Sequence, residues 1–534
     1  MRKIVFYQLI LLSLIFYCDD ANGTKIYQWD QAHNHIGEDV TVEGVITYTN
    51  NIGKICFLNF HPNFDKFISI LIFREYFSVF PKSPEIYYYL KKVRVHGRIS
   101  SFKGKAQIKI YDQRQIEVVG EYERKKELQP CSCNYPDKLE ITAINIGQGD
   151  ATLVATPSKI MLIDAGESHW YSNTDALKID SVIRKKYGKN CRKIDYVLIT
   201  HFHLDHLGYI YLPENQNDQP LNSKLEPLTI GETPYQPIGY GGLGYLVLEK
   251  SYEIGKMVVR DFKNHNPNKS PQDGGSKTFR NWQIILESKE GLKKFHPEIV
   301  KLGESQIQLG SIAKSPVIVD IIASDGATIT YPNGCDPGKF FGGSNYIIRG
   351  DRSKDNLPPS ENDLSISLVI SYRDFQMYIG GDLSGENYTS KFGYRYSNVE
   401  KCLASDPYIV NRYGQKIDVF RVNHHGSSHS TCIDILEMFN PTVSIFSVGD
   451  HNTYGHVSPH ILDRVCKVSK AVYLTECGEN IGSREAAASK GVIVVDDEYP
   501  NELEEDEIDD PDVNITVLSD GRKYYLDGNE FISH

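Results

Sequence analysis

Apolar side chains recur in five short stretches near the start of the chain, most of them alternating with polar ones, a pattern typical of strands. The stretches are 39–48, 54–60, 67–73, 92–100 and 106–111. Turn residues separate them, among them Gly53 and the sequence Lys103-Gly104-Lys105. A short helix is expected near 77–81. Several strands within about ninety residues predict a small all-β barrel over residues 24–119.

A charged segment without periodicity follows the last of these strands. It holds a mixed acidic and basic run at 121–127 and two prolines, Pro130 and Pro136. Such a composition favours a linker, here expected over 120–137.

Residues 138–534 alternate between strand and helix signals. Strands are expected at 139–146, 151–155, 160–163, 197–200, 365–372, 375–379, 418–422, 443–448, 514–518 and 523–526. Apolar residues recur at helical spacing in 176–187 and 433–439, which predicts two helices. A further helix is expected to begin with Ser458 as its N-cap and Pro459 at its first position. Strands and helices follow one another in two runs of similar order, which predicts an α/β fold with two sheets sandwiched between helices. The stretch of about 209–361 is weakly patterned, and we expect an insertion with its own strands over the mouth of the site.

The first residues have the composition of a signal peptide. Arg2 and Lys3 precede an apolar run from 4 to 17 and the small residues Ala21 and Gly23, which predicts a leader over 1–23 and export of the protein. A lipoprotein anchor at Cys18 is the alternative, although bulky residues precede it. No other segment has transmembrane length, so no transmembrane anchor is expected. Nine cysteines remain, an odd number, and some of them are expected to form disulfides. The sequence indicates no oligomeric state.

The net charge of -11 does not exclude a nucleic-acid partner, because local basic surface matters more. Between 82 and 114 the chain has nine lysines and arginines against two acidic residues, with tyrosines and Phe102 among them. Basic grooves with stacking aromatics bind single strands, so we expect Arg98, Lys103 and Lys105 to contact nucleic acid. A solvated basic face with buried aromatics is an equal alternative.

A dense group of metal-binding side chains follows the strand at 197–200. His201 and His203 are two residues apart, so an extended backbone directs both rings to one side, where they can bind one ion. Asp205 and His206 are adjacent and diverge, so they can serve a second ion. The alternative is a structural histidine cluster or a closed structural zinc site.

These residues also resemble a known family. The sequence from Thr200 to His206 matches the His-x-His-x-Asp-His signature of the metallo-β-lactamase superfamily, which implies an αββα sandwich. Further motifs resemble the hydrolase domain of competence-type DNA-uptake proteins and their secreted relatives: 145–150, 162–166, 380–382, 424–427 and 452–456. In the first domain, 40–46, 93–99 and 102–110 resemble OB-fold nucleic-acid-binding domains.

The resemblance implies a role for each matching residue. His201 and His203 would bind one ion, Asp205 and His206 the other, with Asp382 bridging and either His424 or His425 completing the second site. Asp150 and Asp164 would orient ligand histidines. His456 would contact substrate or act as an acid, with a structural role equally open.

One departure from the family pattern concerns the first ion. Many relatives have a further lone histidine there, for which His265 and His296 are the only candidates. Asn362 and Ser365 are expected to fill that space instead, and a centre with one ion is the alternative.

We therefore expect an exported metal-dependent phosphodiesterase that acts on DNA or RNA through hydroxide bound by two metal ions. Asp205 would orient this hydroxide or accept its proton. The His/Asp donors make zinc the expected metal, bound at two sites, and manganese is the alternative. Two other functions remain open: an extracellular hydrolase of another phosphodiester, an amide or a lactone, and a non-catalytic surface binding protein.

Overall fold

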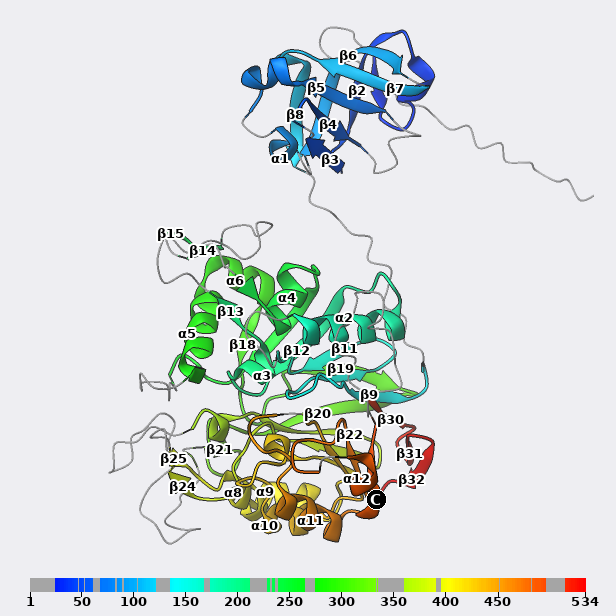
Figure 1. The fold of residues 1–534 in the computed structure, drawn as a ribbon. Coiled ribbons are helices and arrows are strands. Elements are labelled where there is room, and N and C mark those ends of the chain that lie inside the picture. Colours follow the sequence, from blue (N-terminus) through cyan, green and yellow to red (C-terminus); the bar gives the residue numbers. More distant parts are fainter. Residues whose placement is uncertain are drawn as a thin grey trace, which may run out of the picture. The chain divides into compact units, whose positions relative to one another are not determined.

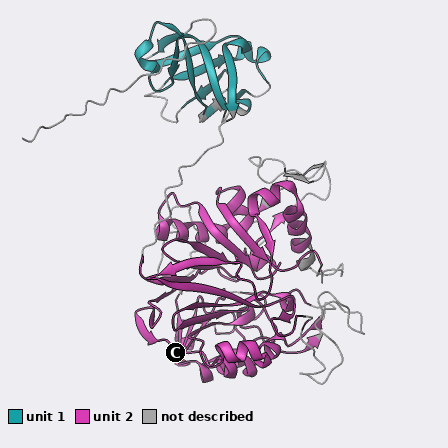
Figure 2. Cartoon of the chain, turned by 180° about the vertical axis from the view of Figure 1, so that it is seen from behind, with its two compact units in different colours: residues 1–127 teal, residues 128–534 magenta. Residues whose placement is uncertain are grey.

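The computed structural model divides the chain into two compact units, residues 1–127 and 128–534 (Figure 2). It describes residues 25–46, 48–51, 53–60, 68–81, 84–88, 91–102, 104–121, 135–167, 173–211, 228–230, 233–235, 239–264, 274–332, 334, 360–389, 395–450, 452–481, 483–495 and 514–534. The expected signal peptide, the lipoprotein site at Cys18 and most of the expected linker lie outside these residues. The expected boundaries of the domains stay a prediction.

The first unit is built on one eight-stranded sheet with the order β1-β2-β6-β7-β5-β4-β3, in which β8 also pairs with β6. Its strands are β1 (Ile26–Gln28), β2 (Asp39–Val45), β3 (Tyr48–Asn51), β4 (Ile55–Asn59), β5 (Ser69–Phe73), β6 (Lys91–Phe102), β7 (Lys105–Ile110) and β8 (Ile116–Glu121). The long strand β6 pairs with β2 and β8 along its first part and with β7 along its last four residues. Among the described residues β1 and β3 do not pair to close a ring, so the OB-like barrel stays a prediction.

Short helices connect these strands: η1 (Ala32–His35), η2 (Arg74–Val79), α1 (Pro84–Tyr87) and η3 (Gln113–Gln115). The helix expected near 77–81 is the 3₁₀ helix η2, which begins and ends earlier in the chain.

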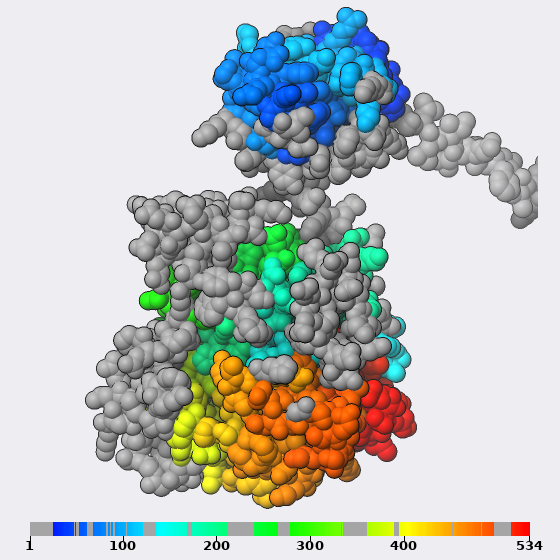
Figure 3. All heavy atoms as spheres, viewed as in Figure 1, coloured from blue at the N-terminus to red at the C-terminus, as the bar shows by residue number. Residues whose placement is uncertain are grey.

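The second unit contains two nine-stranded sheets. The first has the order β18-β17-β12-β11-β10-β9-β30-β31-β32. Its strands are β9 (Leu139–Ala143), β10 (Thr152–Ala155), β11 (Ile160–Ile163), β12 (Lys193–Ile199), β17 (Glu253–Val259), β18 (Pro297–Ile299), β30 (Ile515–Ser519), β31 (Lys523–Leu526) and β32 (Asn529–Ile532). Because β30 pairs with β9, the red C-terminal strands lie beside the cyan start of the unit (Figure 3).

The second sheet has the order β19-β20-β22-β23-β26-β27-β28-β29, with β21 paired to β20. Its strands are β19 (Gln308–Ile312), β20 (Ser315–Ser324), β21 (Ala327–Thr328), β22 (Ser367–Tyr372), β23 (Phe375–Ile379), β26 (Val419–Arg421), β27 (Val443–Phe446), β28 (Ala471–Leu474) and β29 (Val492–Val494). Three small pairs complete the strands: β13 (Ile210–Tyr211) with β16 (Gly239–Tyr240), β14 (Leu228–Ile230) with β15 (Thr233–Tyr235), and β24 (Tyr388–Thr389) with β25 (Arg395–Tyr396).

Helices cover the outer face of each sheet, which gives four layers (Figure 1). Over the first sheet lie α2 (Thr174–Tyr187), α4 (Gly242–Leu248), α5 (Gly274–Glu287) and α6 (Lys289–Phe295). Over the second lie α8 (Val399–Ser405), α9 (Pro407–Tyr413), α10 (Ile433–Phe439), α11 (Pro459–Val468) and α12 (Arg484–Ser489). A third apolar core fills the space between the sheets, with Leu198 and Met377 among its fully buried residues. The layers confirm the expected α/β sandwich.

Several element boundaries match the sequence pattern. The helix expected at 433–439 is α10, and α11 begins at Pro459 with Ser458 as its N-cap.

Cys191 and Cys402 are each disulfide-bonded. In the part of the chain that the structure describes, none of the helices is both long and apolar enough to cross a membrane.

The expectation of an insertion over 209–361 was wrong for its regular elements. Strand β17 pairs in parallel with β12, one strand in from the edge of the first sheet, and β20 pairs with β22 in the second. Helices α4 and α5 pack into the core of the first half. Glycine, asparagine and lysine between these elements obscured the periodicity by which they would have been recognised.

The short helix α3 (Leu204–Leu207) is tied through its backbone to the turns that follow β9 and β11. Asp150 N donates to Asp205 O at 2.8 Å, and Ala165 N donates to His206 O at 2.8 Å. Gly166 fits against this helix so closely that an added Cβ would lie 1.8 Å from Asp205 O. The position of α3 therefore requires glycine at residue 166.

We expect Gly166→Ala to displace α3 and lower the free energy of unfolding by about 3 kcal/mol, the upper end of overpacking costs, because a backbone atom has to move. Urea unfolding and zinc titration measure both effects. Gly120→Ala is the control, since its Cβ would approach nothing closer than Lys92 Cβ at 3.9 Å. Equal stability and zinc affinity in the two variants would contradict the expectation.

Candidate metal centre

Three strand ends bring the candidate ligands together. His201 and His203 follow β12, and Asp205 and His206 lie on α3 directly after them. Asp382 follows β23, the neighbour of β26 in the second sheet, and β26 leads into the 3₁₀ turn η5 (Asn423–Gly426). Both sheets therefore present their polar ends to one place.

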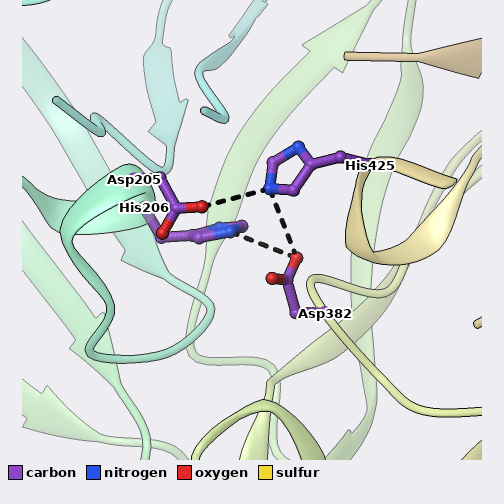
Figure 4. Close-up of side chains that lie close together, drawn as sticks. All are labelled: Asp205, His206, Asp382 and His425. Carbon is purple, nitrogen blue, oxygen red and sulfur yellow. Dashed lines mark ion pairs between the residues drawn. The ribbon is translucent and has the colours of Figure 1, made fainter. Parts of the chain in front are cut away.

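The first donor group consists of Asp205, His206, Asp382 and His425 (Figure 4). His206 Nε2 lies 3.1 Å from Asp382 Oδ1, and His425 Nε2 lies 3.8 Å from the same oxygen. His425 Nε2 is also 3.4 Å from Asp205 Oδ2. The structure thus places His425, rather than His424, in this group.

The second donor group consists of His201, His203 and Asp382. His201 Nε2 lies 3.0 Å from His203 Nδ1 and 3.8 Å from Asp382 Oδ2. The other oxygen of the same carboxylate faces the first group, so Asp382 is common to both. This is the arrangement expected of a carboxylate that bridges two ions.

The donor atoms fit divalent metal. His206 Nε2, Asp382 Oδ1 and His425 Nε2 are buried, and none of them makes a hydrogen bond with any described residue. Buried polar atoms without a hydrogen bond are costly, and three that converge within ion-pair distance of one another are explained by a shared ligand. Imidazole and carboxylate donors suit zinc, and carboxylates also suit manganese.

Electrostatics favour cation binding at the same atoms. Burial raises the pKa of Asp382, but the neighbouring His206, His424 and His425 outweigh it and hold this pKa well below its usual value. For Asp205, His206 and His425 likewise outweigh burial and lower the pKa. Burial, His206 and His203 lower the pKa of His201 well below its usual value, so its ring is neutral and able to bind metal.

Asp164 holds His206 from behind. Its carboxylate accepts from Thr200 N and from Thr200 Oγ1, both at 2.8 Å, and lies 2.9 Å from His206 Nδ1. Burial lowers the pKa of His206, yet Asp382, Asp205 and Asp164 together raise it well above its usual value. Asp164 therefore orients the ring so that Nε2 faces the first donor group.

Asp150 supports the opposite histidine. It lies 3.5 Å from His425 Nδ1, which also donates to Ser447 O at 2.9 Å. Arg421, at the end of β26, pairs with Asp150. Burial lowers the pKa of Arg421 to about 9. This contact was not predicted from the sequence, although an arginine at the end of an apolar strand could have indicated it.

Asn362 and Ser365 lie beside the centre, and their expected role in place of a missing histidine stays a prediction. Asn362 Nδ2 is 3.2 Å from His424 Nε2, and Ser365 Oγ accepts from Asp382 N at 3.2 Å. His296 is the exposed C-cap residue of α6 and belongs to none of the donor groups formed by described residues. His265 lies outside the described residues.

His456 lies next to both histidines of η5. Its ring centroid is 5.6 Å from that of His424 and 6.2 Å from that of His425. Burial, with His424 and His425 beside it, lowers the pKa of His456 to about 3. The ring is therefore neutral at pH 7 and carries no imidazolium proton to donate.

A buried ion pair that the sequence reading missed supports the ligand loop. Arg260 follows β17 and donates through Nε and Nη2 to the two carboxylate oxygens of Glu361, each at 2.6 Å. Glu361 Oε1 also accepts from Phe202 N at 2.9 Å, between His201 and His203. The guanidinium lies 5.2 Å from the Phe202 ring centroid. The pair therefore fixes the turn that carries the second donor group.

The expected nucleic-acid contacts lie in the first unit. Arg98 and Lys105 are exposed on β6 and β7, and Lys105 is paired across the strands with Phe102, whose side chain is 59% exposed. Lys103 lies outside the described residues. Two other basic residues of this stretch, Lys92 and Arg94, pair with Glu43 at 2.6 and 2.8 Å, so the basic surface is smaller than the sequence suggested.

Comparison with known proteins supports the fold. Residues 144–211 match the family model of the metallo-beta-lactamase superfamily. No curated protein matches the chain. The competence-type resemblance stays a prediction.

Three solved structures are similar at low identity. A diphosphatase from the PhnP family is 9% identical, with a TM-score of 0.28, over 71% of this chain and 98% of its own. YhfI from Bacillus subtilis is 10% identical, with a TM-score of 0.29, over 63% and 96%. The short form of human tRNase Z is 11% identical, with a TM-score of 0.26, over 67% and 96%. Nothing about the substrate of this chain follows from such low scores.

We expect Glu361→Gln to lower both the free energy of unfolding, by up to about 3 kcal/mol, and the affinity for zinc, because the buried Arg260 loses its bidentate carboxylate and keeps only the more distant Asp325, at 3.6 Å. Chemical unfolding and calorimetric zinc titration measure the two quantities. Glu304→Gln removes only an exposed partner of Lys301 and should change neither.

The double variant Arg260→Met Glu361→Gln tests the cause. It removes the buried cation but keeps an amide oxygen that can accept from Phe202 N, so stability and zinc affinity should exceed those of Glu361→Gln. They should stay below those of the natural protein, because the buried Asp325 also loses Arg260 as a partner. A double variant as impaired as Glu361→Gln would show that the loss has another origin.

Proposed function

We propose that this protein is an exported metal-dependent phosphodiesterase that cleaves DNA or RNA. The observation that carries the proposal is the single carboxylate, Asp382, shared by two donor groups of buried histidines and aspartates. A divalent ion bound at each group would polarise a phosphoryl oxygen and activate water at neutral pH.

The residues of the chain have distinct parts in this reaction. Asp205 is the most accessible carboxylate of the first group, with 27% of its side chain exposed, and its lowered pKa keeps it ionised. It can therefore orient the attacking water and accept its proton. Asp164 and Asp150 keep His206 and His425 aligned, and His456 contacts the substrate.

Export is supported by cysteine chemistry. Disulfides persist mainly in oxidising compartments, and both Cys191 and Cys402 are disulfide-bonded. The signal-peptide composition of residues 1–23 points the same way.

Incubation of the purified protein with zinc or manganese and single- and double-stranded DNA and RNA tests the activity. We expect degradation of at least one polymer, and a loss of at least about 100-fold in Asp205→Ala His206→Ala, which removes two donors of one group. Metal content, measured on both proteins, separates lost binding from lost chemistry. A natural protein that holds metal but degrades none of the polymers would reject the proposal and favour another substrate or a binding function.

The binding of nucleic acid by the first unit is tested separately. We expect Arg98→Ala Lys105→Ala to weaken binding of single-stranded DNA and to reduce the slope of log K against log salt by about 1.4, since each lost phosphate contact contributes about 0.7. Lys293→Ala Lys294→Ala, on the exposed side of α6, is the control with equal charge change. An unchanged slope in the first variant would place the nucleic-acid contacts elsewhere or support a substrate of another class.

A further inference from the structure

The loop that joins β27 to α11 is fixed at both ends by side-chain hydrogen bonds. Asn452 Nδ2 donates to Gly449 O at 2.8 Å and to His456 O at 2.7 Å, and its Oδ1 accepts from His456 N at 2.8 Å. From the next segment, Glu479 N donates to His456 O at 2.8 Å. Residues 452 and 456 are therefore held in one conformation, with Tyr454 between them.

Tyr454 is exposed although its loop is fixed. Its side chain is 73% exposed, the highest value among the large hydrophobic side chains of the described residues. A tyrosine on a loop contributes to stability when its ring is buried, so core packing does not explain this residue. A ring held in place and left open to solvent is instead suited to contact with a ligand.

The Tyr454 ring extends a series that begins at the metal centre. It lies parallel to the His456 ring, with an interplanar angle of 17° and centroids 5.8 Å apart. The His456 ring lies in turn at 20° to the ring of His425, a member of the first donor group, with centroids 6.2 Å apart. Three nearly parallel rings thus lead from the centre to solvent.

The ring series places Tyr454 at the mouth of the centre. Tyr454 and His456 precede α11, and His425 lies in η5, so all three rings come from the second half of the sandwich. The Tyr454 ring, which is exposed to solvent, therefore lies at the open end of the series that begins in the first donor group.

We propose that Tyr454 is a stacking subsite for a nucleobase of the strand whose phosphodiester bond occupies the metal centre. This inference rests on the proposed phosphodiesterase function and names the part of the substrate that the site recognises. In a nucleic-acid strand, each base is joined to its phosphate by a single sugar. A substrate phosphate bound beside Asp382 in the metal centre therefore places its base at the mouth of the centre. Every base offers a flat aromatic face, and the exposed face of Tyr454 continues the ring series, so the subsite selects nucleotides without selecting one base.

Binding of two phosphate monoesters to the zinc-loaded full chain tests the subsite. Thymidine 5′-monophosphate carries a base, and deoxyribose 5-phosphate is the same ligand without one. Since one stacked base contributes about 1–3 kcal/mol, calorimetry should show about 5- to 150-fold tighter binding of the nucleotide. We expect Tyr454→Phe to keep this ratio and Tyr454→Leu to reduce it to near one.

The control and the opposing outcomes follow from the same measurement. Ile532→Ala removes a side chain that is 72% exposed outside the site, so its ratio should equal that of the natural protein. A ratio near one in the natural protein, or an unchanged ratio in Tyr454→Leu, overturns the subsite. Equal weakening of both ligands in Tyr454→Leu also overturns it, because the ring would then act on the metal centre. The binding ratio is independent of hydrolysis, so a failure of the proposed function is seen separately, in the polymer assay.

Discussion

The burial of several carboxylates and imidazoles at one point is the constraint on which the second unit depends. Asp164, Asp382, His201, His206 and His425 are almost wholly inaccessible to solvent. A buried charge without a partner is strongly destabilising, so each of these groups needs an opposite charge, a hydrogen bond or a metal ion. The two sheets satisfy this need together, because Asp382 comes from one sheet and its nearest histidine, His206, from the other.

Two buried arginines show how each half of the sandwich supports the centre from outside. Arg260 makes a bidentate pair with Glu361 and fixes the turn of His201 and His203 through Phe202. Arg421 pairs with Asp150, which lies against His425. In both cases a guanidinium holds a carboxylate that in turn positions a ligand residue. The ligands therefore keep their geometry through contacts that do not involve metal, which prepares the site for binding.

The extent to which sequence predicts this site depends on how local each signal is. The cluster from His201 to His206 is contained in one turn, and Asp382 and His425 each stand in a short motif after an apolar strand, so all were found. Glu361 and Arg260 are 101 residues apart and carry no motif, and their pairing depends on the placement of β17 beside β12. Pattern alone also left His424 and His425 equivalent. Both residues have positive φ, their ring planes differ by 69°, and only His425 enters the first donor group.

Charge balance at the centre favours the binding of cations. The carboxylates of Asp150, Asp164, Asp205 and Asp382 surround the donor atoms, and the buried guanidinium of Arg421 pairs with one of them. With neutral histidines, this leaves an excess of about three negative charges, which one divalent ion does not neutralise. The remainder is balanced either by a second divalent ion or by a proton on His206, because the surrounding carboxylates raise the pKa of this ring. The same carboxylates that make the centre costly to bury therefore make it a strong attractor of cations.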